Sequence, residues 1–206
     1  MRYYRKPKQN SIPYRMEPKT AKPARAALDR EAWIKGAIAI LAEHGAESLR
    51  VEVLAKRLGV TKGSFYWHFK DRRDLLEAVL DSWKEGRIRD IRKQTQAEPG
   101  GEVAALLHTI DVYASARNRK GVSIEAAVRG WARRDPQAVA VVEEVDAERL
   151  ACACRLFLVC GIAEEEAQAR CVMLYAYVLG FTLMRCGAFA ADMSALKAWI
   201  AERIAR

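Results

Sequence analysis

The stretch RVEVLAKRLGVTKGSFYWHFKDRRDLL, from Arg50 to Leu76, constrains the fold more than any other part of this 206-residue chain. Its first apolar residues recur at positions i, i+3, i+4 and i+7, as on one face of a short helix: Val51, Leu54, Ala55 and Leu58. Gly59 follows where a helix ends in a left-handed residue, Val60 gives an apolar contact, and Thr61 is a candidate N-cap. The pattern predicts a helix, a tight turn and the start of a second helix.

The second helix is expected from Lys62 to about His68, with two phenylalanines on its inner face. Phe65 and Phe69 are four residues apart, so their neighbours Lys62, Gly63, Ser64, Tyr66, Trp67 and His68 lie mainly outside. Asp71 and Asp74 form a capping-box pattern that opens a third helix. Two short helices around a glycine turn, the second beginning with small and basic residues, predict a helix-turn-helix.

The same segment resembles the DNA-binding motif of the TetR/AcrR family of bacterial transcriptional regulators. The resemblance covers the 23 residues from Leu54 to Leu76: LA at 54–55, LGVTKGS at 58–64, FYWHF at 65–69 and KDRRDLL at 70–76. One residue departs from the family pattern, because Arg50 stands where a Ser or Thr usually caps the first helix of the motif. Either Ser48 caps the helix one turn earlier, or Arg50 contacts a phosphate instead.

The resemblance implies a role for each exposed residue of the motif. Lys62, Gly63 and Ser64 are expected at base edges, the glycine because a side chain would block close entry. Phosphate contacts are expected from Arg50, Thr61, Tyr66, His68 and Lys70. Trp67 either packs on a sugar or stays a surface aromatic. The alternatives are a half-buried ring in the motif core for Tyr66 and a solvated surface charge for Lys62.

The positive charge of the chain is concentrated at its N-terminal end. Residues 1–28 carry a net charge of +7, residues 29–95 carry +3, and residues 96–206 carry −1. Such an excess suits a partner with a phosphate backbone, here double-stranded DNA. Residues 1–28 contain four prolines and no apolar periodicity, and are expected to be disordered. They are either an arm laid on DNA or a solubilising tail, or the true start is Met16.

Long apolar-periodic segments without strand alternation predict an all-α fold of about nine helices. A helix-turn-helix domain is expected over residues 29–76, with a fourth helix running to about residue 93. The sequence QTQAEPGG at 94–101 then marks a boundary, and residues 101–206 form a C-terminal ligand-binding and dimerisation domain. Its helices are expected over residues 102–116, 124–134 with Ser123 as N-cap, 135–160 opened by Asp135 and Pro136, 162–186, and 192–206.

The segment from Val172 to Met184 is apolar on every helical face, so it must be covered on all sides. One side meets its own core and the other is expected to meet a second copy, which predicts a two-fold homodimer joined by the last two helices. The predicted interface residues are Tyr175, Val178, Leu179, Thr182, Leu196, Trp199, Ile200 and Arg203. A dimer can place two recognition helices in successive major grooves of a pseudo-palindromic operator.

The resemblance further implies a small-molecule inducer pocket in the C-terminal domain, whose filling moves the long fourth helix. Candidate lining residues are polar or aromatic side chains within apolar stripes: His108, Asp111, Tyr113, Trp131, Phe157, Met173, Tyr175, Tyr177 and Phe181. Taken one at a time, each of them is better explained by core packing than by ligand contact. His108 and Asp111 share a helix face, where they form either a metal or polar-ligand site or a surface pair.

Several other functions are disfavoured by what the sequence lacks. It has no catalytic triad order, glycine-rich phosphate loop or paired-carboxylate signature, so an enzyme, a cofactor or a metal site is not expected. The five cysteines are interpreted as core residues of a reducing bacterial cytoplasm, with redox sensing as the alternative. The longest apolar run, of 14 residues, is too short to span a membrane. The remaining alternative is an architectural DNA-binding protein without ligand control, and the choice between repressor and activator depends on where the site lies.

Overall fold

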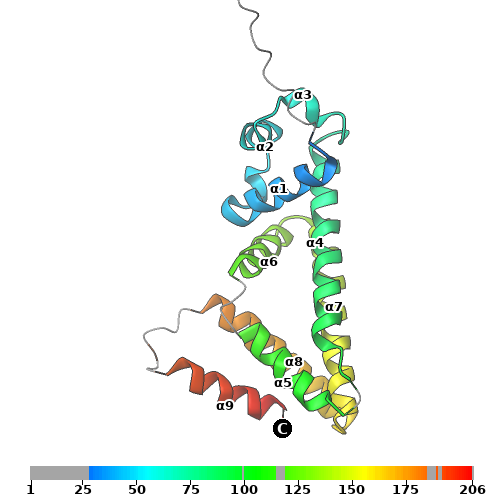
Figure 1. The fold of residues 1–206 in the computed structure, drawn as a ribbon, viewed down its shortest axis with the longest axis vertical. Coiled ribbons are helices and arrows are strands. Elements are labelled where there is room, and N and C mark those ends of the chain that lie inside the picture. Colours follow the sequence, from blue (N-terminus) through cyan, green and yellow to red (C-terminus); the bar gives the residue numbers. More distant parts are fainter. Residues whose placement is uncertain (1–27, 99, 115–118, 185–188, 190–191, 206) are drawn as a thin grey trace, which may run out of the picture.

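The computed structural model of the chain describes residues 28–98, 100–114, 119–184, 189 and 192–205, and within these residues it consists of helices joined by turns and short irregular segments (Figure 1). The elements are α1 Arg30–His44, the short 3-10 helix η1 Ala46–Ser48, α2 Val51–Leu58, α3 Lys62–Phe65, α4 Arg72–Thr95, α5 Glu102–Ala114, α6 Arg119–Ala132, α7 Pro136–Val159, α8 Glu164–Leu183 and α9 Met193–Ala205. The described part of the chain thus contains nine α-helices, which confirms the predicted all-α class.

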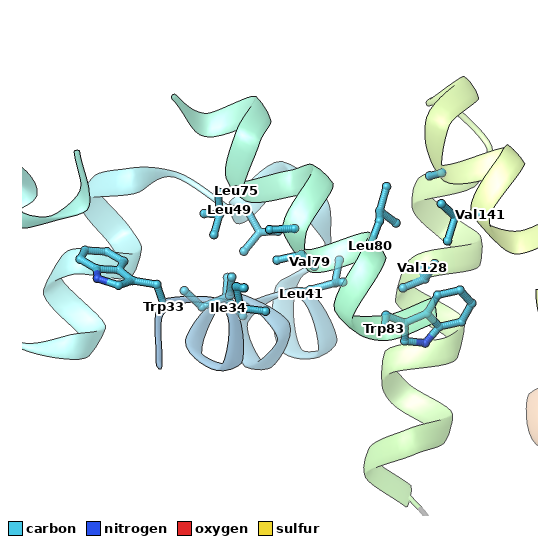
Figure 2. Close-up of a cluster of buried hydrophobic side chains, with 14 of the residues drawn as sticks. Trp33, Ile34, Leu41, Leu49, Leu75, Val79, Leu80, Trp83, Val128 and Val141 are labelled. Carbon is cyan, nitrogen blue, oxygen red and sulfur yellow. The ribbon is translucent and has the colours of Figure 1, made fainter. Parts of the chain in front are cut away.

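A first hydrophobic core joins the N-terminal helices to α6 and the first half of α7 (Figure 2). Leu41 of α1 and Leu75 of α4 are fully buried in it, and Val128 of α6 packs into the same cluster. The predicted boundary at residues 94–101 therefore does not separate two cores, because α6 folds back onto α1. The helix-turn-helix therefore packs in a core built from helices that precede residues 94–101 in the sequence and from helices that follow them.

A second hydrophobic core lies among α5, α8, α9 and the second half of α7. Phe157 of α7 and Leu174 of α8 are fully buried there, and Ile204 closes the cluster from α9. Since α7 contributes to both cores and packs along α4, these two helices form the shared spine of the molecule (Figure 1). At 24 residues each, they are about 36 Å long at 1.5 Å per residue.

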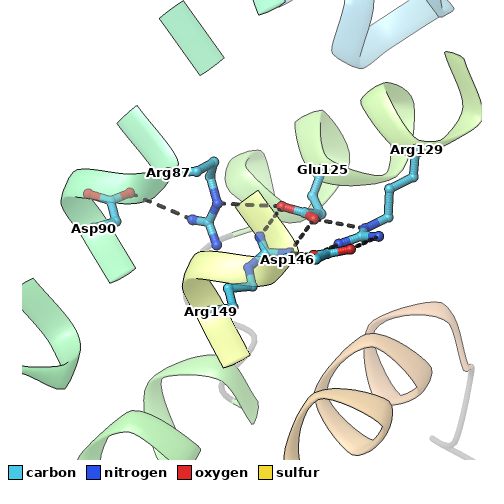
Figure 3. Close-up of polar contacts among 6 residues, drawn as sticks. All are labelled: Arg87, Asp90, Glu125, Arg129, Asp146 and Arg149. Carbon is cyan, nitrogen blue, oxygen red and sulfur yellow. Dashed lines mark hydrogen bonds and ion pairs between the residues drawn. The ribbon is translucent and has the colours of Figure 1, made fainter. Parts of the chain in front are cut away.

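Between the two cores, α4, α6 and α7 are joined by a network of buried and half-buried charges (Figure 3). Glu125 of α6 accepts hydrogen bonds from both terminal nitrogens of Arg149, at 2.9 and 2.6 Å, and from Nε of Arg129 at 2.8 Å. Arg87 of α4 pairs with the same carboxylate at 3.4 Å. Burial alone would raise the pKa of Glu125, but the hydrogen bond from Arg149 and the charges of Arg129 and Arg87 hold it below its ordinary value. This network fixes α4 to the C-terminal helices.

Several predicted helix ends are confirmed by their hydrogen bonds. Asp29 caps α1 by accepting from the amide of Ala32 at 2.7 Å, and Asp71 caps α4 by accepting from the amide of Asp74 at 3.0 Å. Asp135 caps α7 in the same way, with Pro136 at its first position. Gly59 adopts φ 69°, the left-handed conformation that ends α2.

Two predicted helix ends and one predicted side-chain cap are wrong. α3 ends at Phe65 rather than near His68, and the amides of His68 and Phe69 then both bond to the Phe65 carbonyl, at 3.0 and 3.1 Å, in a tight turn. Thr61 makes no side-chain cap, and its carbonyl instead accepts from the Ser64 hydroxyl at 2.8 Å. Ser123 lies inside α6, which begins at Arg119, because one glycine near a helix start weakens a helix without breaking it.

Some predictions fall on parts of the chain that the structure does not describe. Residues 1–27, which make up nearly all of the predicted basic arm, lie outside the described residues, as does Cys186. The side chains of Asp111, Tyr113 and Thr182 also lie outside them. Among the described helices, none combines the length and the apolar character that crossing a bilayer requires.

Candidate nucleic-acid interface

An aromatic cluster fixes the orientation of the recognition segment. Phe65 is fully buried and meets the ring of Trp33 edge-on at 5.5 Å between centroids, while Phe69 stacks on it at 5.2 Å. The Arg30 guanidinium covers the Phe69 ring at 4.8 Å. Because α3 is only one turn long, these contacts rather than its own helical hydrogen bonds hold its orientation.

The predicted DNA-binding residues lie on the opposite side of this aromatic base. Exposed side chains or backbone are found at Arg50, Thr61, Lys62, Gly63, Tyr66, Trp67 and Lys70, while Ser64 and His68 are half-buried. Trp67 is 79% exposed, which is unusual for so large a ring. The ring of Tyr66 is 53% exposed and meets Phe65 edge-on at 5.2 Å, so it touches both the core and the outer surface.

Gly63 has no structural reason to be glycine within the protein itself. It is not among the glycines with positive φ, and a Cβ added to it would come no closer than 3.8 Å to any neighbour, the Thr61 hydroxyl. A side chain would therefore fit both the backbone and the packing of this chain. A glycine at this exposed position leaves the backbone of α3 open to close approach by another molecule.

Lys62 does not point freely into solvent. Its ammonium group donates a hydrogen bond to the carboxylate of Glu52 on α2, and the two side chains form an exposed ion pair. This hydrogen bond raises the pKa of Lys62 and lowers that of Glu52. Sequence analysis missed Glu52, since ten residues and a turn separate it from Lys62.

The first turn of α2 has no side-chain cap. The Ser48 hydroxyl donates back to the His44 carbonyl at 3.0 Å, so Ser48 does not cap α2 as one alternative proposed. Arg50 occupies the N-cap position in an extended conformation and is exposed. Among the residues that the structure describes, its guanidinium has no hydrogen-bond or ion-pair partner, which leaves it available to a phosphate.

Two arginines join the motif to neighbouring helices through hydrogen bonds and an ion pair. Arg72 of α4 donates from Nε to the Leu49 carbonyl at 2.6 Å and from Nη2 to the Ala46 carbonyl at 3.0 Å. Arg57 at the end of α2 makes a bidentate pair with Glu43 of α1, at 2.5 and 2.7 Å. The helix-turn-helix is thereby tied to α1 and α4 as one unit.

The predicted ligand-binding residues do not gather around one cavity. His108 and Met173 are exposed, Phe157 and Tyr175 are buried in the second core, and the rings of Tyr177 and Phe181 pack on each other at 5.6 Å. Trp131 lies elsewhere, on a pocket between α6 and η1. A separate cavity of about 490 Å³ lies at the lower end of α4, lined by Arg92, Thr95, Cys152 and Leu156 among others.

The predicted dimer residues divide into two groups. Tyr175 and Val178 belong to the protomer's own core, where they are 6% and 4% exposed, so they are not presented to a second copy. Leu179, Leu196 and Ile200 are half-buried, whereas Trp199 and Arg203 are exposed. The face of α8 that is exposed carries Val172, at 60%, and Met173, at 55%, which the sequence analysis did not assign to the interface.

The helix-turn-helix segment matches a known family. A sequence profile described as "Bacterial regulatory proteins, tetR family" matches residues 34–79, from α1 to the first turns of α4. Residues 34–79 thus carry a tetR-type DNA-binding motif. This motif is the segment whose geometry is described above, and the remaining helices follow it in the order expected from the family resemblance.

Comparison with individual proteins agrees with this family. The tetracycline repressor protein class C of Escherichia coli is 46% identical over 55 residues, which are 27% of this chain and 25% of that protein. The HTH-type transcriptional regulator AcrR of Shigella flexneri is 31% identical over 77 residues, 37% of this chain and 35% of that protein. The chain thus spans about a quarter to a third of the length of these curated relatives.

The fold outside the motif is also shared with a solved structure. The crystal structure of a transcriptional regulator from Rhodococcus sp. Rha1 superimposes with a TM-score of 0.68 at 20% identity, covering 86% of this chain and 94% of that one. At this identity the likeness shows the fold alone. It extends the agreement from the N-terminal motif to the full helical arrangement.

Proposed function

We propose that this protein is a sequence-specific DNA-binding transcriptional regulator, most simply a homodimeric repressor that a small-molecule inducer releases from its operator. The observation that carries the proposal is α3, whose Phe65 is anchored in the core while Lys62 and Gly63 face outward. A short helix that is fixed by core packing on its inner face and begins with small and basic residues is suited to entering a major groove. The curated relatives named as repressors support the same function.

The proposed contacts follow from exposure and side-chain chemistry. Lys62 and Ser64 offer donors to base edges, with guanine O6 and N7 as suitable acceptors for the lysine, and Gly63 permits close approach. Arg50 and Lys70 offer charged donors to phosphates. Further phosphate donors are the hydroxyls of Thr61 and Tyr66 and the imidazole of His68. These contacts would fix the position of α3 along the DNA. Trp67 is proposed to pack on the sugar-phosphate backbone at the edge of the site.

The proposed dimer is formed through α8 and α9. Val172 and Met173 lie on the face of α8 that the second core leaves uncovered, and Trp199 of α9 is 56% exposed with Arg203 over its ring at 5.0 Å. Exposed large apolar side chains in this arrangement are typical of a subunit interface. A two-fold pair joined here would form a four-helix bundle and present two copies of α3.

The proposed inducer site is the cavity of about 490 Å³ between the lower end of α4 and α7. Its volume is in the range of small-molecule sites, and Thr95 and Arg92 of α4 contribute to its wall. A ligand bound there would contact the long helix that carries the motif at its other end. It could thereby favour one placement of α4 over another.

The test of the proposed function is a footprint on the DNA beside the protein's own gene. A regulator should protect a short pseudo-palindromic site there and lose this protection when the inducer or cell extract is added. An architectural DNA-binding protein would instead protect many sequences with little preference and would not respond to small molecules. The absence of any preferred site on this DNA would favour that second function.

A further inference from the structure

A pocket of about 460 Å³ lies between the DNA-binding half and the turn that joins α6 to α7. One wall comes from η1 and the start of α4, and the other from the end of α6 and the residues that follow it. Its volume suits a small organic molecule, and such sites occur preferentially where two parts of a protein meet. It shares no lining residue with the cavity beside Cys152 that is proposed for the inducer.

The apolar surface of this pocket is formed by residues at the edge of the first core that remain partly exposed. Leu76 of α4, Ala127 and Trp131 of α6 and Ala46 of η1 all line it, and each is only partly buried against that core. The Trp131 indole is held in place because its Nε1 donates to Asp135 Oδ2 at 3.1 Å. A fixed, half-buried indole offers a flat face to a planar ring.

Gly130 keeps the pocket open. It lies in the last turn of α6, and a Cβ placed on it would meet no atom within 4 Å. Glycine weakens a helix relative to alanine, and here it is not among the residues with positive φ. Neither the backbone nor the packing therefore requires a glycine, and its effect is to leave space beside Trp131 unfilled.

The pocket wall carries one positive charge that no carboxylate neutralises. Arg72 bonds only to the carbonyls of Leu49 and Ala46, and among the described residues no acidic group lies within ion-pairing distance of it. The two acids of the pocket already have partners. Glu47 pairs with Arg134 at 2.5 Å, and Asp135 accepts from Trp131 and from the first amides of α7. The remaining charge suits an anionic ligand.

We propose that this pocket binds a planar aromatic carboxylate. The ring lies against Trp131 in the space in front of Gly130, and the carboxylate accepts hydrogen bonds from Arg72. Because its two walls belong to the DNA-binding half and to the α6–α7 region, a ligand bound there favours the arrangement that holds these two parts together. The proposed site does not depend on DNA binding, so it can be tested without DNA.

The test is isothermal titration of the full-length protein with 2-naphthoate, compared with 2-naphthamide and cyclohexanecarboxylate. We expect 2-naphthoate to bind at least about tenfold more tightly than the other two probes. The reason is that 2-naphthamide lacks the negative charge and cyclohexanecarboxylate lacks the flat ring. Gly130→Leu should weaken this binding by about tenfold or more by filling the space, while its melting temperature stays at or above that of the wild type, because leucine is a better helix former. Trp131→Leu should weaken 2-naphthoate but not change the weaker binding of cyclohexanecarboxylate.

The proposal is overturned by any of three results. These are equal binding of 2-naphthoate and 2-naphthamide, no binding of 2-naphthoate at millimolar concentration, and unchanged binding in both folded variants. The last result would place the ligand in another cavity. Since a footprint on operator DNA is measured separately, failure of this site and failure of the proposed function are distinguishable.

Discussion

Glu52 on α2 accepts a hydrogen bond from the ammonium group of Lys62 on α3, so the lysine proposed to contact bases is held by an acid of the neighbouring helix. The pair connects the two helices of the motif across the turn at Gly59. If Lys62 contacts DNA as proposed, DNA competes with Glu52 for its ammonium group. The Glu52 carboxylate is then exchanged for a base or phosphate oxygen when DNA binds.

Glu52→Gln should therefore strengthen DNA binding. The amide cannot form an ion pair, so Lys62 becomes available and a negative charge is removed from the DNA-facing surface. Fluorescence anisotropy with a labelled operator should show a lower Kd, most clearly at low salt. Glu31→Gln is the matched control, since it removes the same charge from an exposed pair with Lys35 within α1. Equal gains in both variants would show that Glu52 acts through net charge alone.

Lys62→Ala should weaken operator binding by roughly five- to hundredfold and relax the preference at one base position. The loss follows from removing a donor to a base edge without disturbing Phe65, which anchors α3. Competition binding against operators altered at single positions measures both effects. Lys93→Ala, an exposed lysine at the far end of α4, is the matched control and should bind like the wild type. Unchanged base preference in Lys62→Ala would remove the base-reading role.

Glu125→Gln should destabilise the fold by about 1 to 3 kcal/mol, because it removes one of the two carboxylates that pair with Arg149, which is 3% exposed, and leaves Asp146 shared between Arg149 and Arg129. Urea unfolding followed by circular dichroism measures the change. Glu143→Gln on the exposed side of α7 is the control and should change stability little. A loss below about 1 kcal/mol in the Glu125 variant would contradict the structural role of the network.

The same carboxylate gives the pH dependence of stability a definite sign. The pKa of Glu125 is lower in the folded protein than its ordinary value of 4.5, so its contribution is fully present above that value. The contribution is lost as the pH falls through the folded pKa. In thermal melts from pH 7 to pH 3, the melting temperature of the wild type should therefore fall more steeply with decreasing pH than that of Glu125→Gln. Parallel curves would contradict the lowered pKa.

Met173→Glu should convert the proposed dimer into a monomer. It places a charge in the centre of the exposed α8 face, where burial against a second copy would leave it unpaired. Gel filtration with light scattering gives the mass, and operator affinity should fall with it. Gln137→Glu adds the same charge at the first turn of α7 and should remain dimeric. A dimeric Met173→Glu protein would move the interface away from this face.

Cys171 should resist alkylation in the folded protein. Burial, together with the neighbouring Cys154 thiol, raises the pKa of Cys171 to about 12, so almost no thiolate forms at pH 8. Iodoacetamide labelling followed by mass spectrometry should modify this residue in urea but not under native conditions. Rapid native labelling would instead favour the redox-sensing interpretation of these cysteines.

Much of this architecture could be predicted from local sequence patterns. The caps at Asp29, Asp71 and Asp135 and the left-handed Gly59 were identified because each acts within a few residues of its own position. The motif was predicted for the same reason: its apolar spacing and turn residues lie in one continuous segment. Hydrogen bonds between residues close in the sequence determine these features, so they can be predicted from a single sequence.

The features that were missed depend on contacts between distant residues. The ends of α3 and α6 differ from prediction because the buried Phe65 and the core around Val128, rather than a cap, hold these helices. Tyr175 and Val178 were assigned to the dimer because an all-apolar helix does not show which of its faces is covered. The pairing of Glu52 with Lys62 and the network around Glu125 likewise join residues with no shared sequence signal.

The most direct test of the central claim is selection of binding sites by the full-length protein from a pool of random double-stranded DNA. If α3 is presented outward on a two-fold dimer, the recovered sequences should contain two inverted half-sites whose centres are separated by about one helical turn or a multiple of it. Selection with Lys62→Ala should lose the preference at one position in both half-sites. Recovery of no common sequence, or of a single half-site without its inverted copy, would contradict the account.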